Sequence, residues 1–174
     1  MKIINKKLVQ KGILIDMYEG DAKNDTLQFP IQYFKHPGAV CVAASPDGTN
    51  FFMVKQFRFG TETDILEFPA GKIDDPNEDP ILGAHRELQE ETGYQAQSLH
   101  SLGHILPAPA YIDEIVHLYY GTDLSFIGQN LDETEDLVIE MHSLPSILEM
   151  INSNIITDAK TVALAYKLHY YLHK

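Results

Sequence analysis

The sequence predicts a mixed α/β domain, in which helices flank a mixed β-sheet. Two observations lead to this prediction. The first half of the chain consists of short β-branched and aromatic runs separated by turn-forming residues, whereas the C-terminal part has apolar residues at three- and four-residue spacing. Strands and helices do not alternate regularly, so a doubly wound parallel sheet is not expected. The 174 residues contain no linker-like stretch, and we expect a single domain, residues 1–174.

The strands are predicted from runs that are bounded by turn chemistry. The residues at 19–25 and 45–50, which are rich in Gly, Asp and Asn, separate the early runs. Strands in this half are expected to pair antiparallel, and the last predicted strand has the weakest pattern. In chain order, the predicted strands are 8–20, 27–36, 38–45, 50–59, 98–108, 114–124 and 138–144.

Three helices are predicted from apolar spacing and capping residues. The first runs from Pro80 to Thr92, with Asp79 as its N-cap and Gly93 at the position of a left-handed C-terminal cap. The others cover 144–154 and 158–174, and each is opened by a Pro or an Asp cap. These helices supply the layers that are expected to cover the sheet.

One face of the first predicted helix carries acidic side chains. At 100° per residue Glu87 and Glu91 share a face, and Glu90 lies on its flank, four residues after Arg86. Adjacent carboxylates repel one another, and oxygen-ligated cations such as Mg²⁺ or Mn²⁺ relieve this repulsion. The alternative is a solvated helix face with Arg–Glu pairs, which is common in proteins. The helix taken alone does not distinguish the two.

Charge and composition exclude several classes of protein. A formal net charge of −12 disfavours nucleic acid and anionic membranes as partners. No apolar stretch approaches the roughly 18 residues of a membrane span, and residues 1–10 lack the apolar region of a signal peptide. The single Cys41 lies in an apolar run and is expected to be buried. We therefore expect a cytoplasmic protein with no membrane and no nucleic-acid partner.

The segment from Gly71 to Tyr94 resembles the Nudix box. That motif is a Gly, five residues, Glu, seven residues, and then Arg-Glu-aliphatic-x-Glu-Glu-x-Gly-hydrophobic. Six residues instead of five separate Gly71 from Glu78, and the extra residue falls in a turn-rich loop that tolerates insertion. The motif positions are filled by Gly71, Glu78, Arg86, Glu87, Leu88, Glu90, Glu91, Gly93 and Tyr94.

Further segments are similar to the ADP-ribose pyrophosphatase branch of this family. They are HPGAV (36–40), KQFRF (55–59), LEFPAGKID (66–74), Pro109 and ITDAKT (156–161), in the expected order. The resemblance implies an α/β/α sandwich around a mixed sheet and metal-dependent hydrolysis of the pyrophosphate bond of ADP-ribose or a related nucleoside diphosphate sugar. It also implies two or three Mg²⁺ or Mn²⁺ ions per site, and a homodimer to which the N-terminal β region, about residues 1–38, contributes.

Glu133 and Glu135 lie in an acidic segment whose composition alone favours an exposed surface loop. Similarity to the family's acidic loop before the last strand makes Glu133 the general base on the attacking water and Glu135 a further metal ligand. The two roles can be exchanged. Arg86 is expected to orient Glu90 through an ion pair.

Other residues are candidates for contacts with the substrate or a metal ion. Arg58 can hold two phosphate oxygens with its guanidinium fork, and an ordinary strand-surface Arg is the alternative. By resemblance, Ala70 gives its backbone carbonyl to a metal ion, and Glu114 contacts the ribose or a neighbouring subunit. Phe34 and Tyr33 are candidates for stacking on adenine, although aromatic residues in strands are more often core.

Two other functions are compatible with the sequence. One is the hydrolysis of another nucleotide sugar or of a dinucleotide. The other is a Nudix-fold module that binds a nucleotide without hydrolysing it. The complete set of Glu87, Glu90 and Glu91 argues against this second alternative, because a sensor has no need to retain all three carboxylates.

Overall fold

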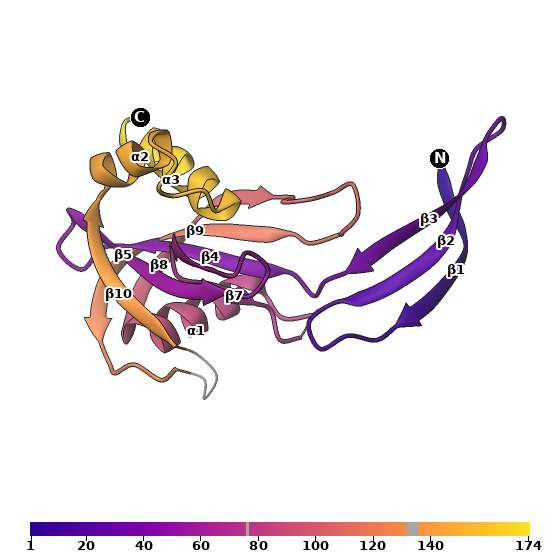
Figure 1. Ribbon diagram of the computed structural model, residues 1–174. Helices are drawn as coiled ribbons and strands as arrows, with labels where there is room; N and C mark the ends of the chain where they lie inside the picture. The colour runs from indigo at the N-terminus through magenta and orange to yellow at the C-terminus, as the bar shows by residue number, and fades with distance from the viewer. Residues whose placement is uncertain (76, 132–135) are drawn as a thin grey trace.

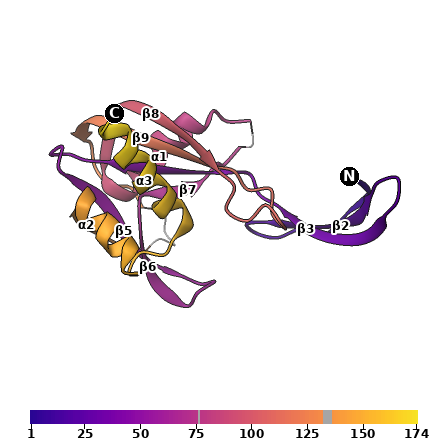
Figure 2. The ribbon, with the colours of Figure 1, turned by 90° about the horizontal axis from the view of Figure 1, so that it is seen from above.

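The computed structural model describes residues 1–75, 77–131 and 136–174. Within these ranges the chain forms a body of two β-sheets and three helices, and a third sheet at the N-terminus extends to one side of the body (Figure 1). The view from above in Figure 2 shows the same separation between the N-terminal sheet and the body. The body contains the elements that position the candidate site.

The N-terminal sheet is antiparallel, with its second strand in the centre. Tyr18 and Tyr33 are opposite each other in neighbouring strands, and their rings stack with centroids 5.7 Å apart. Within these three strands, all of which are described, Ala22 is the single buried residue, so the sheet encloses no core of its own. The strands are β1 (Lys2–Gln10), β2 (Asp16–Lys23) and β3 (Gln28–Lys35).

The sequence-based boundaries in this region were wrong in two respects. The predicted strand at 8–20 is interrupted at residues 11–15, and the predicted turn at 19–25 is largely strand, since β2 continues to Lys23. As the central strand, β2 has its backbone hydrogen-bonded on both sides, which keeps it extended despite its Gly and Asp content. The chain reverses at Asn24, whose Oδ1 accepts hydrogen bonds from the backbone N–H groups of Thr26 and Leu27 at 3.0 and 2.8 Å.

The larger body sheet is mixed. Its two central strands, β4 and β9, are parallel, and the outer pairs are antiparallel. Every residue of β4 is buried, which explains its continuous apolar run, because a strand that is covered on both faces needs no polar side. In spatial order the strands are β7 (Ala70–Lys72), β4 (Ala39–Ala44), β9 (Val116–Phe126) and β8 (Tyr94–Ile105).

The second body sheet is antiparallel and places β5 between β10 and β6. Its strands are β10 (Leu137–Ser143), β5 (Asn50–Arg58) and β6 (Thr63–Glu67). The sequence predicted β5 and β10 but neither β6 nor β7. These two strands have five and three residues, too few for an alternating pattern to be recognised.

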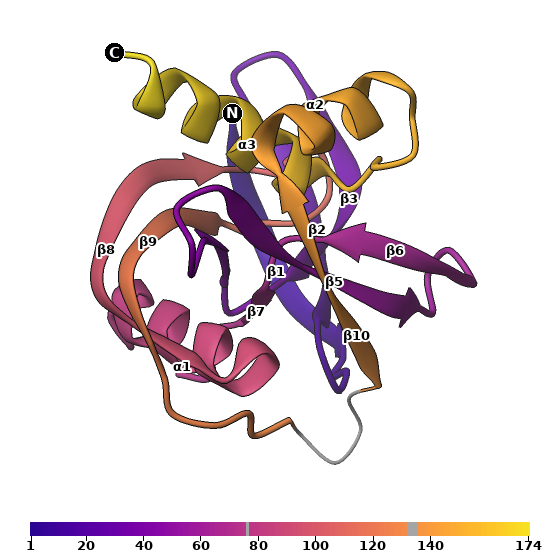
Figure 3. The ribbon, with the colours of Figure 1, turned by 90° about the vertical axis from the view of Figure 1, so that its left-hand side faces the viewer.

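Helices cover the sheets on two sides (Figure 3). On one side Ala84 and Leu88 of the first helix pack against strand residues such as Val40. On the other side the two C-terminal helices contribute Ile147 and Leu164 to a second core cluster. The predicted α/β/α sandwich is thereby confirmed. The helices are α1 (Pro80–Thr92), α2 (Leu144–Asn152) and α3 (Ala159–Leu172).

The ends of α1 follow the predicted capping residues. Asp79 accepts a hydrogen bond from the backbone N–H of Ile81 at 3.1 Å, and Gly93 adopts a left-handed conformation with φ of 80°. The N–H of Gly93 donates to the carbonyl of Gln89 at 2.8 Å. In the described part of the chain, no helix combines the length and the apolar character needed to cross a membrane.

Candidate active site

The six residues from Glu67 to Lys72, here called the site segment, connect α1 with α3. The backbone N–H of Phe68 donates to Thr161 Oγ1 at 3.0 Å, and that of Ala70 donates to Glu91 Oε2 at 3.1 Å. Thr161 belongs to the first turn of α3, and Glu91 belongs to the last turn of α1. The site segment is therefore bonded to helices in both outer layers of the sandwich.

Gly71 lies directly against the carboxyl group of Glu87. A Cβ atom at position 71 would overlap that group, so the close approach requires glycine. Arg86 holds the same region from the other side: its Nη1 donates to Glu87 Oε1 at 2.7 Å and to Glu90 Oε2 at 2.9 Å. Its Nη2 donates to the carbonyl of Lys72 at 3.0 Å. Arg86 thereby links two of the predicted metal ligands to the site segment, which explains its place in the motif.

The predicted acidic face of α1 is turned toward the protein, not toward solvent. Glu87 is 5% exposed and Glu91 is 1% exposed, while Glu90 is half-buried. A solvated helix face, the alternative from the sequence, does not describe two buried carboxylates, because burying charge is unfavourable without compensation. The position of these groups therefore favours a chemical role.

The donor set fits a hard divalent cation. It consists of oxygen atoms, and the glycine at position 71 leaves room for a carboxyl group where a side chain would otherwise stand. Ala70, whose carbonyl was predicted as a metal ligand, is held beside Glu91 through its own N–H group. Among the described residues, no three acidic, His or Cys side chains already surround one point, and Arg86 is paired with Glu87 and Glu90. The residues that would hold the cation are Glu87, Glu90, Glu91 and Ala70.

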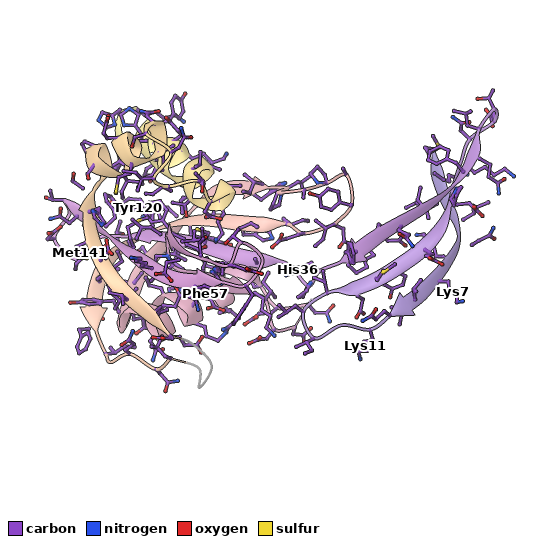
Figure 4. The ribbon with its side chains drawn as sticks, in the orientation of Figure 1. Lys7, Lys11, His36, Phe57, Tyr120 and Met141 are labelled. Atoms are coloured by element: carbon purple, nitrogen blue, oxygen red, sulfur yellow. The ribbon has the colours of Figure 1, made fainter. Side chains whose placement is uncertain are left out.

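A cavity of about 280 Å³ lies next to the site segment. Three residues predicted from the sequence, Arg58, Ala70 and Glu114, line it together. His36 lines it as well, with its Nδ1 atom 3.8 Å from Glu114 Oε1, and lies where the N-terminal sheet meets the body (Figure 4). The cavity thus joins the predicted phosphate contact and the predicted ribose contact to one of the predicted metal ligands.

Phe34 lies apart from this cavity within one chain. It lines a different hollow with residues 10–15 and Met17. Tyr33 stacks on Tyr18 in the N-terminal sheet. Stacking on adenine by either residue stays a prediction, and the structure of one chain does not bring them to Arg58.

The two residues predicted from the sequence as general base and further metal ligand, Glu133 and Glu135, lie outside the described residues. The described residues just before them approach the end of α1. Gln129 donates from Nε2 to the carbonyl of Glu91 at 2.6 Å, and the N–H of Asn130 donates to the carbonyl of Glu90 at 3.2 Å. The roles of Glu133 and Glu135 stay predictions.

Sequence reasoning missed a buried charge cluster at the edge of the cavity. Glu67 is 1% exposed and accepts hydrogen bonds from Arg58 Nε and Lys160 Nζ, and Lys160 also pairs with Asp158 Oδ1 at 3.0 Å. A signal was present, because Glu67 stands within the run ILEFPA, where a buried strand position requires any charge to have a partner.

The cluster keeps both cations charged. Burial lowers the pKa of the Lys160 ammonium group, but the charges of Asp158 and Glu67 outweigh it and raise the pKa above its ordinary value. Burial also acts to lower the pKa of the Arg58 guanidinium group, and its hydrogen bond and ion pair with Glu67 again give a net increase. Both side chains are therefore positively charged near neutral pH.

The fold is an α/β/α sandwich, and its candidate site lies at the acidic helix α1. The model of the NUDIX domain matches residues 34–162 of this chain. The chain belongs to the Nudix family. Members of this family typically require divalent metal ions.

Two curated relatives are similar over most of the chain. The chain is 38% identical over 172 residues to the ADP-ribose pyrophosphatase of Bacillus subtilis (strain 168). This alignment covers 97% of this chain and 91% of that protein. It is 42% identical over 132 residues to the methanol dehydrogenase activator of Bacillus methanolicus. This second alignment covers 74% of this chain and 70% of that protein.

A solved structure described as an ADP compounds hydrolase superimposes with a TM-score of 0.86. The alignment covers 99% of this chain and 94% of that one, at 23% sequence identity. At this identity the likeness establishes the fold, including the placement of the N-terminal sheet as part of it.

Proposed function

We propose that this protein hydrolyses the pyrophosphate bond of ADP-ribose and releases AMP and ribose 5-phosphate. The observation that carries the proposal is that the Nudix-box residues meet a cavity of about 280 Å³ at the site segment. Glu87 and Glu91 contact Gly71 and Ala70 of that segment, and Arg58 lines the cavity beside it. The choice of ADP-ribose rests on the name of the Bacillus subtilis relative, which aligns with nearly the whole chain.

The residues of the site divide the work of phosphoryl transfer to water. When bound, Mg²⁺ or Mn²⁺ would neutralise phosphate charge and assist the departure of the leaving phosphate. Glu87, Glu90, Glu91 and the carbonyl of Ala70 would hold the two or three ions that we propose per site. Arg58 holds phosphate oxygens through its fork of donors. Glu133 accepts the proton of the attacking water, and Arg86 keeps Glu87 and Glu90 in place.

The bond changes balance without a further reactant. The water oxygen forms a bond to one phosphorus atom, and the bond between that phosphorus and the bridging oxygen breaks. The bridging oxygen leaves with the other phosphate, and the proton of the water passes to the carboxylate of Glu133. Each product then carries one phosphate group, as in AMP and ribose 5-phosphate.

We further propose that two chains associate through the N-terminal sheet. The sheet exposes large apolar side chains although it encloses no core: Ile3, Leu8, Val9 and Phe29 are each 40% exposed or more. Exposed apolar groups of this kind, here on the two outer strands β1 and β3, mark an interaction surface. A second copy of the chain is the partner that the family resemblance implies.

A panel of sugar nucleotides tests the proposed substrate. ADP-ribose, a GDP-sugar, a UDP-sugar and a nicotinamide dinucleotide are each incubated with Mg²⁺ or Mn²⁺, and the products are separated by ion-exchange chromatography. ADP-ribose is expected to give the highest kcat/KM. Faster turnover of another compound would reassign the substrate within the same enzyme class, and tight binding without turnover of any compound would support a nucleotide-binding module.

The panel needs a control for contaminating hydrolases. Glu90→Gln removes a predicted metal ligand, and Glu149→Gln makes the same chemical change at an exposed position of α2, in the opposite helical layer. Turnover that belongs to this protein is lost in the first variant and kept in the second. Activity that persists undiminished in both variants would mean either a contaminating hydrolase or a site that does not depend on Glu90.

A further inference from the structure

Glu67 is a buried carboxylate with a cation on each side. It is the last residue of β6, its side chain is 1% exposed, and it accepts from Arg58 Nε through one oxygen and from Lys160 Nζ through the other. A carboxylate removed from water is strongly unfavourable unless it is paired and hydrogen-bonded. A neutral apolar residue at this position would have been sufficient for packing. We therefore attribute the presence of a charged residue to its ion pairs with Arg58 and Lys160.

Lys160 is itself fixed from the start of α3. Its Nζ lies 3.0 Å from Asp158 Oδ1, and Asp158 is the N-cap that accepts from the N–H of Thr161 at 2.9 Å. Thr161 in turn accepts from the N–H of Phe68, the residue that follows Glu67. Lys160 and Glu67 are thus part of a closed set of contacts between α3 and the site segment, which leaves the Glu67 carboxylate little freedom to rotate.

Arg58 is the outer member of this cluster. Its side chain is 40% exposed and lines the cavity, whereas Glu67 is enclosed. The contact with Glu67 occupies Nε, and within the described part of the chain no further side-chain acceptor is bonded to its two Nη nitrogens. The planar fork is therefore held along one edge, while its other donors are available to a ligand in the cavity.

We propose that Glu67 is a positioning residue for hydrolysis, which is braced by Lys160 and fixes the Arg58 guanidinium for contact with the substrate phosphates. This rests on the proposed function, in which Arg58 binds those phosphates. A long side chain that is already fixed loses less freedom when the ligand binds, and its donors are in place as charge develops. Glu67 and Lys160 need not touch the substrate to have this effect.

Double substitutions separate this role from a purely structural one. Glu67→Gln keeps the size of the side chain but removes the charge that holds Arg58, so kcat/KM for ADP-ribose is expected to fall by about 10- to 100-fold. Arg58→Ala removes the phosphate contact itself. If Glu67 acts through Arg58, the double variant Arg58→Ala/Glu67→Gln has the same kcat/KM as Arg58→Ala, within about twofold. If the loss of kcat/KM in the double variant equals the product of the losses in the two single variants, the proposal is wrong.

Lys160→Met provides a second test if Glu67→Gln does not fold. This change removes the brace and leaves the contact between Glu67 and Arg58. A loss of about threefold or more in kcat/KM is expected, and it should vanish in an Arg58→Ala background. An equal loss in both backgrounds would contradict the proposal. Thermal unfolding of every variant shows how much of each loss comes from unfolded protein.

Asp64→Asn is the matched control. Asp64 lies in the same hairpin, 56% exposed, and its carboxylate is 3.9 Å from Lys55 Nζ. This variant also removes a carboxylate from an ion pair, but away from the cavity lining, and is expected to stay within about twofold of the parent protein.

Binding of ADP distinguishes failure of the inference from failure of the proposed function. ADP contains a pyrophosphate, and its Kd in the presence of Mg²⁺ is measured by calorimetry for the same variants. If the parent protein does not turn over ADP-ribose, the proposed function fails. Non-additive losses of ADP affinity at positions 58 and 67 would then still support the positioning role, and additive losses would refute it.

Discussion

Gly71 and Glu87 are in contact at a distance that only glycine permits. They are far apart in the motif, yet Gly71 lies so close to Glu87 that a Cβ atom on residue 71 would overlap the Glu87 carboxyl group. The first position of the Nudix box is therefore explained by sterics: a side chain at position 71 would displace one of the proposed metal ligands. The contact connects the site segment to α1 and makes the spacing between the two positions a structural requirement.

Gly71→Ala is expected to reduce kcat by about 10²-fold or more, because Glu87 must move away from its place beside Arg86. Stability should fall by about 1–3 kcal/mol, as is usual for overpacking, and the fold should persist. Steady-state kinetics and urea unfolding check both expectations. Gly60→Ala is the control, since a Cβ atom at position 60 meets no atom within 4 Å. Equal activity of the two variants would show that the position of Glu87 is unimportant.

Glu90→Gln and Glu91→Gln are each expected to lower kcat by at least about 10²-fold, because each removes an anionic oxygen ligand. Their effects on stability should differ. Glu91 is buried and accepts from the N–H of Ala70, whereas Glu90 is half-buried, so only Glu91→Gln is expected to lower stability by about 1–3 kcal/mol. Activity titrated with Mg²⁺ and urea unfolding measure the two quantities. Full activity of either variant at limiting Mg²⁺ would show that α1 has a structural role and does not supply the metal ligands.

Glu133→Gln is expected to lower kcat by roughly 10²–10⁴ with little change in KM, because glutamine keeps the reach of the side chain and loses its basicity. Added Mg²⁺ should not restore the activity. Glu135→Gln, by contrast, should be partly rescued by Mg²⁺, as expected for a metal ligand. The reverse pattern would exchange the two roles. Two silent variants would place the base elsewhere, with Glu90 and its partner Arg86 as the next candidate.

Sedimentation velocity tests the proposed homodimer. The chain has a mass of 19.6 kDa, and at micromolar concentration we expect a species of twice that mass. The physical reason is the exposed apolar surface of the N-terminal sheet, for which an interface of ordinary size would hold at this concentration. A monomer throughout the micromolar range would refute the proposal. Leu8→Asp places a charge on the sheet and should shift the equilibrium toward monomer, whereas Lys11→Asp, beyond the end of β1, should not.

His117 is expected to make the protein less stable in mild acid. Burial lowers the pKa of its imidazole below the ordinary 6.5, and the neighbouring His104 lowers it further, although Asp79 acts in the opposite direction. Below about pH 6.5 the unfolded chain therefore binds more protons at this position than the folded chain. The free energy of unfolding consequently decreases as the pH is lowered.

Urea unfolding at about pH 7.5 and 5.5 measures this effect. In His117→Gln the difference in stability between the two pH values should be smaller than in the parent protein. His173→Gln, at an exposed position after α3, should leave the difference unchanged. An identical pH dependence in the parent and in His117→Gln would show that another group is responsible.

Local signals in the sequence were sufficient for α1. Asp79, Pro80 and Gly93 fix its ends through contacts within a few residues, and the apolar stripe identifies its buried side. The acidic face was predictable for the same reason. The chemical reading of that face came from the motif, because helical spacing alone is also typical of a solvated surface.

Features that depend on distant segments were not predictable from one sequence. The partners of Glu67 come from the preceding strand β5 and from α3, so its buried charge pointed to a need for partners without identifying them. The extension of β2 through Gly20 and Asp21 depends on hydrogen bonds to two neighbouring strands, which override the turn preference of these residues. In both cases tertiary contacts decide the outcome.

Phosphorus-31 NMR of ADP-ribose turnover in water enriched in oxygen-18 tests the central claim most directly. With Mg²⁺ present, we predict AMP and ribose 5-phosphate in equal amounts, with the label in the phosphate of one product, because water attacks a single phosphorus atom. With EDTA in place of Mg²⁺, ADP-ribose should stay intact. Intact ADP-ribose in the presence of Mg²⁺ and Mn²⁺, or equal hydrolysis in EDTA, would contradict the proposed function.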